Sequence, residues 1–332
     1  MTVSSYDVVA IGNAIVDIIA RCDDAFLNEQ GLSKGHMQLV DQDAANKLYS
    51  AIGPAVEISG GSAANTIAGV ASFGGKAAYI GKVSDDDFGR IFAHDINASG
   101  VSYQTKPAQS DTPTARSIVL VTPDAERTMS TYLGISPELD SSEVDSDLIK
   151  QSKILYLEGY LFDAPQAMEA FRLAASIAKS SDCQVSLTLS DGFCVDRHRG
   201  EFLSFIKDDI DILFANESEI LSLYETQSFQ TAIDNVSKDA KIAAVTRSEK
   251  GSVIVTGSNK HDVSAESASQ VADTTGAGDL FAAGFLFGQA QGMALEQSAK
   301  LGHIAAAEII SHIGARPETS LRELANQHNL LL

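Results

Sequence analysis

The segment from Val271 to Phe285 constrains the fold more than any other part of the sequence. It reads VADTTGAGDLFAAGF, with two glycines around one alanine, then an aspartate, then small and apolar residues without proline. This composition predicts a helix packed on most of its sides, with Gly276, Ala277 and Gly278 at its N-terminus. The first N–H groups of a helix lack partners inside it, so glycines there allow an anionic group to approach the backbone.

Asp279 follows these glycines directly. A carboxylate beside an anion-binding loop can accept a proton from a hydroxyl, and phosphoryl transfer to an alcohol needs both groups. A glycine turn whose aspartate merely complements the helix dipole is the alternative interpretation.

The run from Asp273 to Asp279, DTTGAGD, followed by a helix of small residues, resembles the C-terminal signature of the ribokinase-like (PfkB-type) carbohydrate and nucleoside kinases. The stretch from Gly60 to Gly89 resembles the N-terminal signature of the same family, and the resemblance extends over essentially the whole chain. It implies a kinase that uses ATP and Mg²⁺. In such a kinase Asp279 is the catalytic base, and the backbone of 276–278 stabilises the transferred phosphate.

Alternating strand and helix patterns occupy the second half of the chain, with strands expected at 154–158, 185–189 and 210–216. Such alternation predicts a parallel sheet covered on both faces. The predicted fold class is therefore α/β, a ribokinase-like doubly wound, mainly parallel sheet with a small β-sheet lid.

The expected lid consists of a short strand at 37–40 and a hairpin formed by 115–121 and 127–133 around a Pro–Asp turn. A lid excludes water from the acceptor, although a plain surface hairpin would show the same pattern. We assign 1–12, 49–100 and 136–332 to a large nucleotide-binding domain, and 13–48 and 101–135 to the lid.

The candidate acceptor site begins after the first strand, 6–12, where Asn13 and Asp17 follow its carboxyl end. Open α/β sheets bind ligands at such ends, although an aspartate that caps a turn fits the spacing equally well. The resemblance assigns both residues to the hydroxyls of a sugar. Tyr160 offers an aromatic wall for a purine, or simply packs in the core. The other candidates are two glycines that permit close backbone approach and an amide that both donates and accepts, namely Gly60, Gly61 and Asn65.

The candidate nucleotide and metal residues follow later strands. Asn216 and Glu219 read as a helix N-cap and a first-turn acid, and the resemblance uses them to order Mg²⁺, with Glu219 acting through water. Thr246 and Gly251 resemble a nucleotide-binding segment in which Ser248 replaces a glycine. His303 lies on the helix that borders adenine in the family, or serves packing. The resemblance also implies a monovalent cation, K⁺ in several relatives, near Asp273, Thr275 and 313–315.

Charge and composition limit the classes of partner. The chain has 24 Lys and Arg against 44 Asp and Glu, a net charge of −20, which repels nucleic acids and anionic membranes. We see no signal peptide and no membrane-spanning run, and the three cysteines have no metal-ligand spacing. We expect a cytoplasmic enzyme, a monomer or homodimer, whose partners are small molecules.

Three segments indicate the branch of the family: 211–219, 187–190 before Phe193, and 159–161 after a strand. They resemble the adenosine kinases, which implies transfer to the 5′-hydroxyl of adenosine to give AMP in purine salvage. A sugar kinase acting on ribose, fructose or a deoxygluconate is the alternative, as is another purine nucleoside kinase. A catalytically silent nucleotide-binding protein is less consistent with the sequence, because binding alone does not need Asp279.

Overall fold

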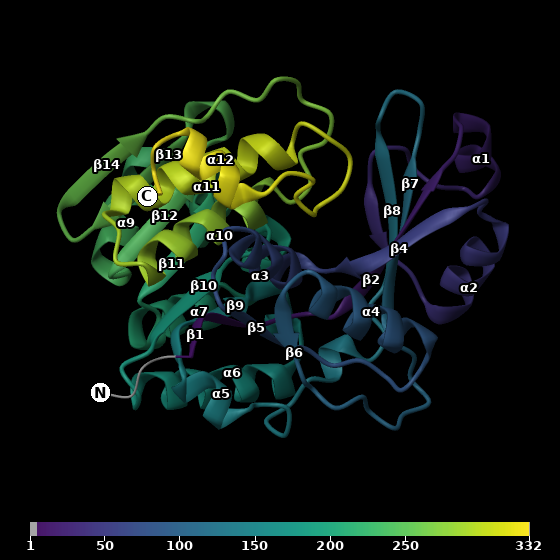
Figure 1. Cartoon of the computed structure of the whole chain (residues 1–332), viewed down its shortest axis with the longest axis horizontal. Helices are drawn as coiled ribbons and strands as arrows, with labels where there is room; N and C mark the ends of the chain where they lie inside the picture. Colours follow the sequence, from purple (N-terminus) through teal and green to yellow (C-terminus); the bar gives the residue numbers. More distant parts are fainter. Residues whose placement is uncertain (1–4, 332) are drawn as a thin grey trace.

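The structure, a computed structural model, describes residues 5–331 and contains two sheets (Figure 1). The larger sheet has nine strands in the order β14-β13-β12-β11-β10-β9-β1-β5-β6. In this order the strands from β12 to β6 are parallel to one another, and β13 and β14 pair antiparallel. This confirms the predicted mainly parallel α/β sheet. The strands are β1 (Tyr6–Ile11), β5 (Ala77–Ile80), β6 (Val101–Tyr103), β9 (Ser152–Glu158), β10 (Gln184–Thr188), β11 (Ile212–Asn216), β12 (Ile242–Thr246), β13 (Ser252–Thr256) and β14 (Asn259–Val263).

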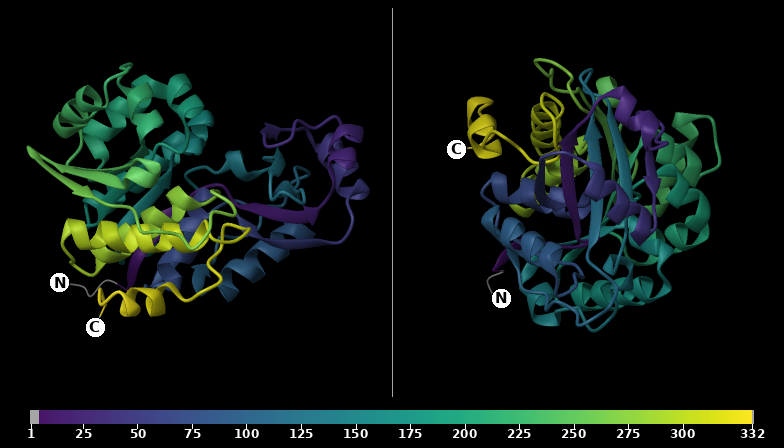
Figure 2. Two further views of the ribbon diagram at one scale, coloured as in Figure 1. Left: turned by 90° about the horizontal axis from the view of Figure 1, so that it is seen from above. Right: turned by 90° about the vertical axis from the view of Figure 1, so that its right-hand side faces the viewer.

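Helices cover both faces of this sheet (Figures 1 and 2). Successive residues of β1 point into different cores, Val8 and Ala10 into one, Val9 and Ile11 into the other. A strand buried on both faces is the signature of a doubly wound sheet. The first core includes residues of α3 (Ser62–Ser72), α4 (Asp87–Ala98), α10 (Ala277–Ala290), α11 (Leu295–Ile309) and α12 (Leu321–Gln327). The second includes residues of α5 (Ser146–Lys150), α6 (Pro165–Lys179), α7 (Gly192–Asp209), α8 (Glu217–Leu223) and α9 (Phe229–Asp239).

The smaller sheet extends away from this body (Figures 1 and 2) and has the strand order β3-β8-β7-β2-β4. Its two sides differ because side chains alternate along each strand. Val16 and Ile18 of β2 join a buried core with Leu27 and Leu48 of the two flanking helices, while Asp17 points to the opposite side. The elements are β2 (Ile15–Arg21), β3 (Met37–Leu39), β4 (Ala55–Gly60), β7 (Ala115–Val121), β8 (Arg127–Tyr132), α1 (Asp24–Glu29) and α2 (Gln42–Ala51).

The membership of two strands differs from the ranges that we assigned to the two domains. β4 pairs with β2 in the small sheet, although 55–60 falls inside the range given to the large domain. β6 pairs with β5 in the large sheet, although 101–103 falls inside the range given to the lid. Hydrogen bonding between strands decides membership, and the local sequence of an edge strand does not reveal its partner.

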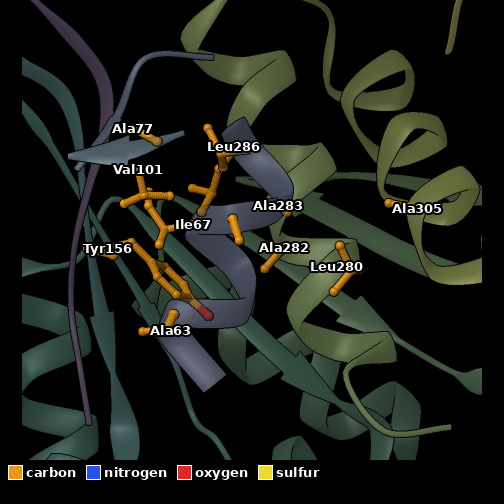
Figure 3. Close-up of a cluster of buried hydrophobic side chains, with 14 of the residues drawn as sticks. Ala63, Ile67, Ala77, Val101, Tyr156, Leu280, Ala282, Ala283, Leu286 and Ala305 are labelled. Carbon is orange, nitrogen blue, oxygen red and sulfur yellow. The ribbon is translucent and has the colours of Figure 1, made fainter. Parts of the chain in front are cut away.

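Helix α10 is packed tightly between α3 and α11. A Cβ built on Gly69 of α3 would lie 2.6 Å from the Ala283 Cβ, and one on Gly284 would lie 2.4 Å from the Gly302 nitrogen. Figure 3 shows Ile67 of α3 beside Ala283 and Leu286 of α10. The predicted all-round packing of this helix is therefore confirmed. Among residues 5–331, no helix is long and apolar enough to cross a membrane.

Candidate active site

A cleft of about 940 Å³ lies where the parallel strands end and the small sheet begins. Five strands place a residue at their carboxyl ends in its wall, as ligand sites in open α/β sheets require. These residues are Asn13, Glu158, Thr188, Asn216 and Thr246. Among the residues predicted for the site, those in the cleft wall are Asn13, Asp17, Gly61, Asn65, Tyr160, Asn216, Glu219, Thr246, Thr275, Gly276, Ala277, Gly278 and Asp279.

The N-terminus of α10 opens into this cleft. Its N-cap, Gly276, has φ of +79°, a left-handed conformation that favours glycine, and no side chain from residues 5–331 caps the helix. A Cβ placed on Gly278 meets no atom within 4 Å, so free space lies directly above the backbone. The helix end therefore offers N–H groups and positive potential to an anion, with room for it to approach.

Asp279 stands in the first turn of α10, half-buried in the cleft wall. The Ser62 hydroxyl donates to its Oδ1 at 2.7 Å, and the Asn65 amide nitrogen donates to its Oδ2 at 3.1 Å. Burial raises the pKa of Asp279, while these two hydrogen bonds and the charge of Arg316 act in the opposite direction. The result is a carboxylate with both oxygens oriented and with free lone pairs toward the cleft, which suits a proton acceptor.

Asp17 projects into the same cleft from β2. Gly60, in the paired strand β4, makes room for it, because a Cβ there would lie 2.2 Å from the Asp17 Oδ2. Burial raises the pKa of Asp17 to about 6, the positive charges of Arg316 and Arg127 lower it, and Asp279 raises it further. Near neutral pH Asp17 is thus an acceptor for two hydroxyl donors. Gly60 itself supports the site without lining it.

Asn13 is fixed by a buried carboxylate, Glu158, at the end of β9. Glu158 accepts from the Asn13 amide nitrogen at 2.6 Å and from the Asn13 and Ala63 backbone nitrogens at 3.2 and 2.8 Å. Burial raises the pKa of Glu158 to about 7, although the hydrogen bonds from Asn13 and Ala63 act to lower it. Ser136 donates to the Asn13 Oδ1 at 2.9 Å, so every polar atom of the Asn13 side chain is oriented.

Asn216 and Glu219 form the capping box at the start of α8. The Asn216 backbone and amide nitrogens donate to the two Glu219 oxygens at 2.9 and 2.6 Å, and Asn216 Oδ1 accepts from the Glu219 nitrogen at 2.8 Å. Burial raises the pKa of Glu219 to about 7, and Asp191 and Asp279 add to the shift. The capping interpretation is confirmed. Both Glu219 oxygens are already bonded, so these residues fit a magnesium ion that keeps its waters better than one ligated directly.

Asp273 lies just outside the cleft wall, and its carboxylate already has a cationic partner. Arg127 Nη1 donates to it at 2.5 Å, and the Thr275 and Gly314 backbone nitrogens donate at 2.9 and 3.3 Å. The Arg127 guanidinium therefore already neutralises the negative charge of Asp273 that would attract a monovalent cation. The residues expected to hold K⁺ do not fit that ion in this arrangement, and we propose no such site.

Three nucleotide-site candidates differ in their positions. Thr246 ends β12 and lines the cleft. Gly251 forms a turn behind it, with φ of +88° and the Val263 carbonyl 2.0 Å from a Cβ built there. His303 lies away from the cleft, 2.9 Å from Ser252 Oγ and packed on Phe281, and burial lowers its pKa to about 4. His303 therefore stays neutral in a packing role, the alternative that the sequence offered.

The lid side of the cleft is largely apolar. Met37, Met129 and Val119 are paired across β3, β8 and β7, so they form one row on the face that lines the cleft. Tyr160 and Phe193 also line the cleft, and Phe193 is 78% exposed. An aromatic side chain that is this exposed and lines a cleft is available for contact with a ligand.

Sequence reasoning missed four residues that shape this site, namely Ser62, Arg127, Glu158 and Arg316. Ser62 and Glu158 lie inside segments whose patterns predict only a glycine turn and a strand. The position of Glu158 at the carboxyl end of a parallel strand was a usable signal. Arg316 donates hydrogen bonds to the carbonyl oxygens of Ser59 and Ala64, which lie 257 and 252 residues earlier in the chain. No local sequence pattern indicates such contacts.

Residues 7–321 match the family described as pfkB family carbohydrate kinase. The chain is 56% identical to an adenosine kinase from Sinorhizobium meliloti, with a TM-score of 0.90 and coverage of 97% of this chain and 99% of that one. It is 52% identical to a probable sugar kinase from Rhizobium etli, with a TM-score of 0.92 and coverage of 99% and 100%. It is also 32% identical to the probable fructokinase-6 of Arabidopsis thaliana, over 72% of this chain and 64% of that protein.

Proposed function

The chain belongs to the pfkB family of carbohydrate kinases, and from this membership we propose that it transfers the γ-phosphoryl group of ATP to the 5′-hydroxyl of adenosine. That it is a phosphotransferase with an alcohol acceptor follows from the family. The choice of adenosine as the acceptor is our proposal, and it is supported by the sequence identity to the adenosine kinase of Sinorhizobium meliloti.

The observation that carries the proposal is the lining of the cleft. The lid contributes a row of polar side chains and, next to it, a row of apolar side chains, and two aromatic side chains also line the cleft. Asp17, Ser117 and Thr131 are paired across three strands and present oxygens along one line. The row of Met37, Met129 and Val119 runs next to it. Ribose hydroxyls match the polar row, and a purine ring matches the apolar row and the two aromatic side chains of the cleft, Tyr160 and Phe193, whereas a free sugar has no apolar ring to bury.

The chemistry assigned to each group follows from its position. Asp17 and Asn13 hold the ribose hydroxyls, and Asp279 takes the proton from the 5′-hydroxyl as it attacks. Backbone N–H groups at the α10 N-terminus, within 276–278, stabilise the charge on the transferred phosphoryl group. Magnesium would supply charge neutralisation on the ATP phosphates when bound, and Asn216 and Glu219 would order it through water.

The test compares kcat/KM for adenosine, inosine, ribose and fructose at one ATP concentration. We expect adenosine to exceed ribose by well over tenfold, because a stacked ring contributes on the order of 1 kcal/mol beyond its area burial, and the burial adds more. Phe193→Ala should lower the value for adenosine and leave that for ribose unchanged. Leu173→Ala, a matched change at a partly exposed apolar residue on α6, should alter neither.

A higher kcat/KM for ribose or fructose than for adenosine would contradict the proposal and favour a sugar kinase. The names of two relatives, a probable sugar kinase and a probable fructokinase, make that the second candidate.

A further inference from the structure

The catalytic carboxylate of Asp279 is oriented by a different helix from its own. Ser62, the first residue of α3, and Asn65, one turn later on the same face, each donate to one carboxylate oxygen, at 2.7 and 3.1 Å. The two helices approach closely because Gly69 has no side chain facing Ala283. The orientation of Asp279 therefore depends on residues more than 200 positions earlier in the chain.

We propose that Ser62 is a positioning residue for phosphoryl transfer, whose hydroxyl fixes the Asp279 carboxylate in the orientation that accepts the acceptor's proton. The inference rests on the proposed function only through the role of Asp279 as base, and it holds for any alcohol acceptor. A carboxylate oxygen that accepts one hydrogen bond keeps a lone pair for a second donor. Asp279 lines the cleft together with Ser62, so this second position is open to an acceptor in the cleft.

The chemistry of the donors supports this assignment. The nearby cation, Arg316, donates to the Ser59 and Ala64 carbonyl oxygens, and its charge reaches Asp279 only over a distance. A guanidinium bound directly to the carboxylate would lower its basicity and occupy its lone pairs. A neutral hydroxyl and a neutral amide orient the base at a smaller cost in basicity. Among residues 5–331, the Asn65 Oδ1 is buried without a hydrogen-bond partner, so it can accept from a hydroxyl of the acceptor.

The first experiment removes the hydroxyl. Ser62→Ala should lower kcat about tenfold, the scale of a hydrogen bond to a charged group, and leave KM for ATP and for the acceptor within about twofold. Ser62→Thr, which retains the hydroxyl, should recover most of the rate, and Ser62→Cys, a weak donor of similar size, should not. Ser72→Ala changes the same residue type at the other end of α3, where the side chain accepts from Leu321, and should leave kcat unaltered.

The second experiment is a double-mutant cycle with Asp279→Asn. If Ser62 acts through Asp279, adding Ser62→Ala to Asp279→Asn should cause no further loss of kcat. A second tenfold loss in that background would overturn the proposal, as would an unchanged kcat in Ser62→Ala alone. The assays use whichever acceptor in the panel gives the highest turnover, so the result stands even where adenosine is not that acceptor.

Discussion

At Gly278 an added side chain is expected to impair phosphoryl transfer without impairing folding. A Cβ there meets no atom within 4 Å, so Gly278→Val fits the helix, yet its methyl groups occupy the space above the α10 N–H groups. We expect turnover to fall at least a hundredfold, the scale of losing transition-state stabilisation by backbone donors. The melting temperature should change little. Steady-state kinetics and thermal unfolding of the purified variant check both statements.

Gly200→Val provides the matched control. Gly200 is an exposed helical glycine of α7 whose Cβ also meets no atom within 4 Å, and it does not line the cleft. Its variant should keep full turnover. Near-normal activity in a folded Gly278→Val protein would remove the anion-binding role of this backbone.

Side chains in short motifs could be predicted from the sequence, whereas their supporting partners could not. Asp279 and Gly278 belong to one uninterrupted pattern, and Asn13 and Asp17 follow a recognisable strand. The groups that orient them come from distant parts of the chain: Ser62 for Asp279 and Glu158 for Asn13. The predicted roles of these site residues stay predictions until the variants are measured.

At the scale of elements, the ion pair of Arg127 and Asp273 connects strand β8 of the lid with the loop before α10. Their side chains are only 9% and 5% exposed. Removing one partner of a buried pair leaves the other charge uncompensated, at a cost of about 3–5 kcal/mol. Arg127→Met should therefore lower the free energy of unfolding by about that amount and raise KM for the acceptor, because the lid loses this contact with the large domain.

Arg90 offers a control pair on the surface. It contacts Asp87 at 2.5 Å, with side chains 63% and 91% exposed, and such pairs contribute less than about 1 kcal/mol. Urea unfolding of Arg127→Met and Arg90→Met compares the two. Equal and small losses would show that the lid contact contributes little to stability.

The elements themselves were largely predictable, but their pairing was less so. The hairpin of β7 and β8 and the short strand β3 lie within one or two residues of the predicted ranges. Their periodicity and the Pro–Asp turn are local signals. The pairing of β4 with β2 and of β6 with β5 depends on contacts between distant residues, so the ranges assigned to the lid differed there.

For the whole molecule, three carboxylates in the cleft make stability depend on pH. Burial raises the pKa values of Asp17, Glu158 and Glu219 to about 6, 7 and 7. Between about pH 5 and 7 the native state therefore binds more protons than the unfolded state, and stability decreases as the pH rises through this range. His303, with its pKa lowered to about 4, acts in the opposite direction with a single proton.

We therefore expect the free energy of unfolding in urea to increase from pH 7.5 to pH 5.5. Glu158→Gln should reduce this slope, because one of the three groups no longer titrates, and Glu169→Gln, at an exposed residue of α6, should leave the slope unchanged. A free energy of unfolding that decreases from pH 7.5 to pH 5.5 would contradict the expectation.

The strand order of the lid also determines when the lid can form during synthesis. Within residues 5–331 the edge strand β3 pairs only with β8, and Met37 lies opposite Met129, about 90 residues later in the chain. At a translation rate of ~5–20 residues per second, β3 waits roughly 5–20 s for its partner to leave the ribosome. β2 and β4 can pair earlier, since β4 ends at Gly60. The nascent chain therefore carries the strand Met37–Leu39 without its partner strand through that interval.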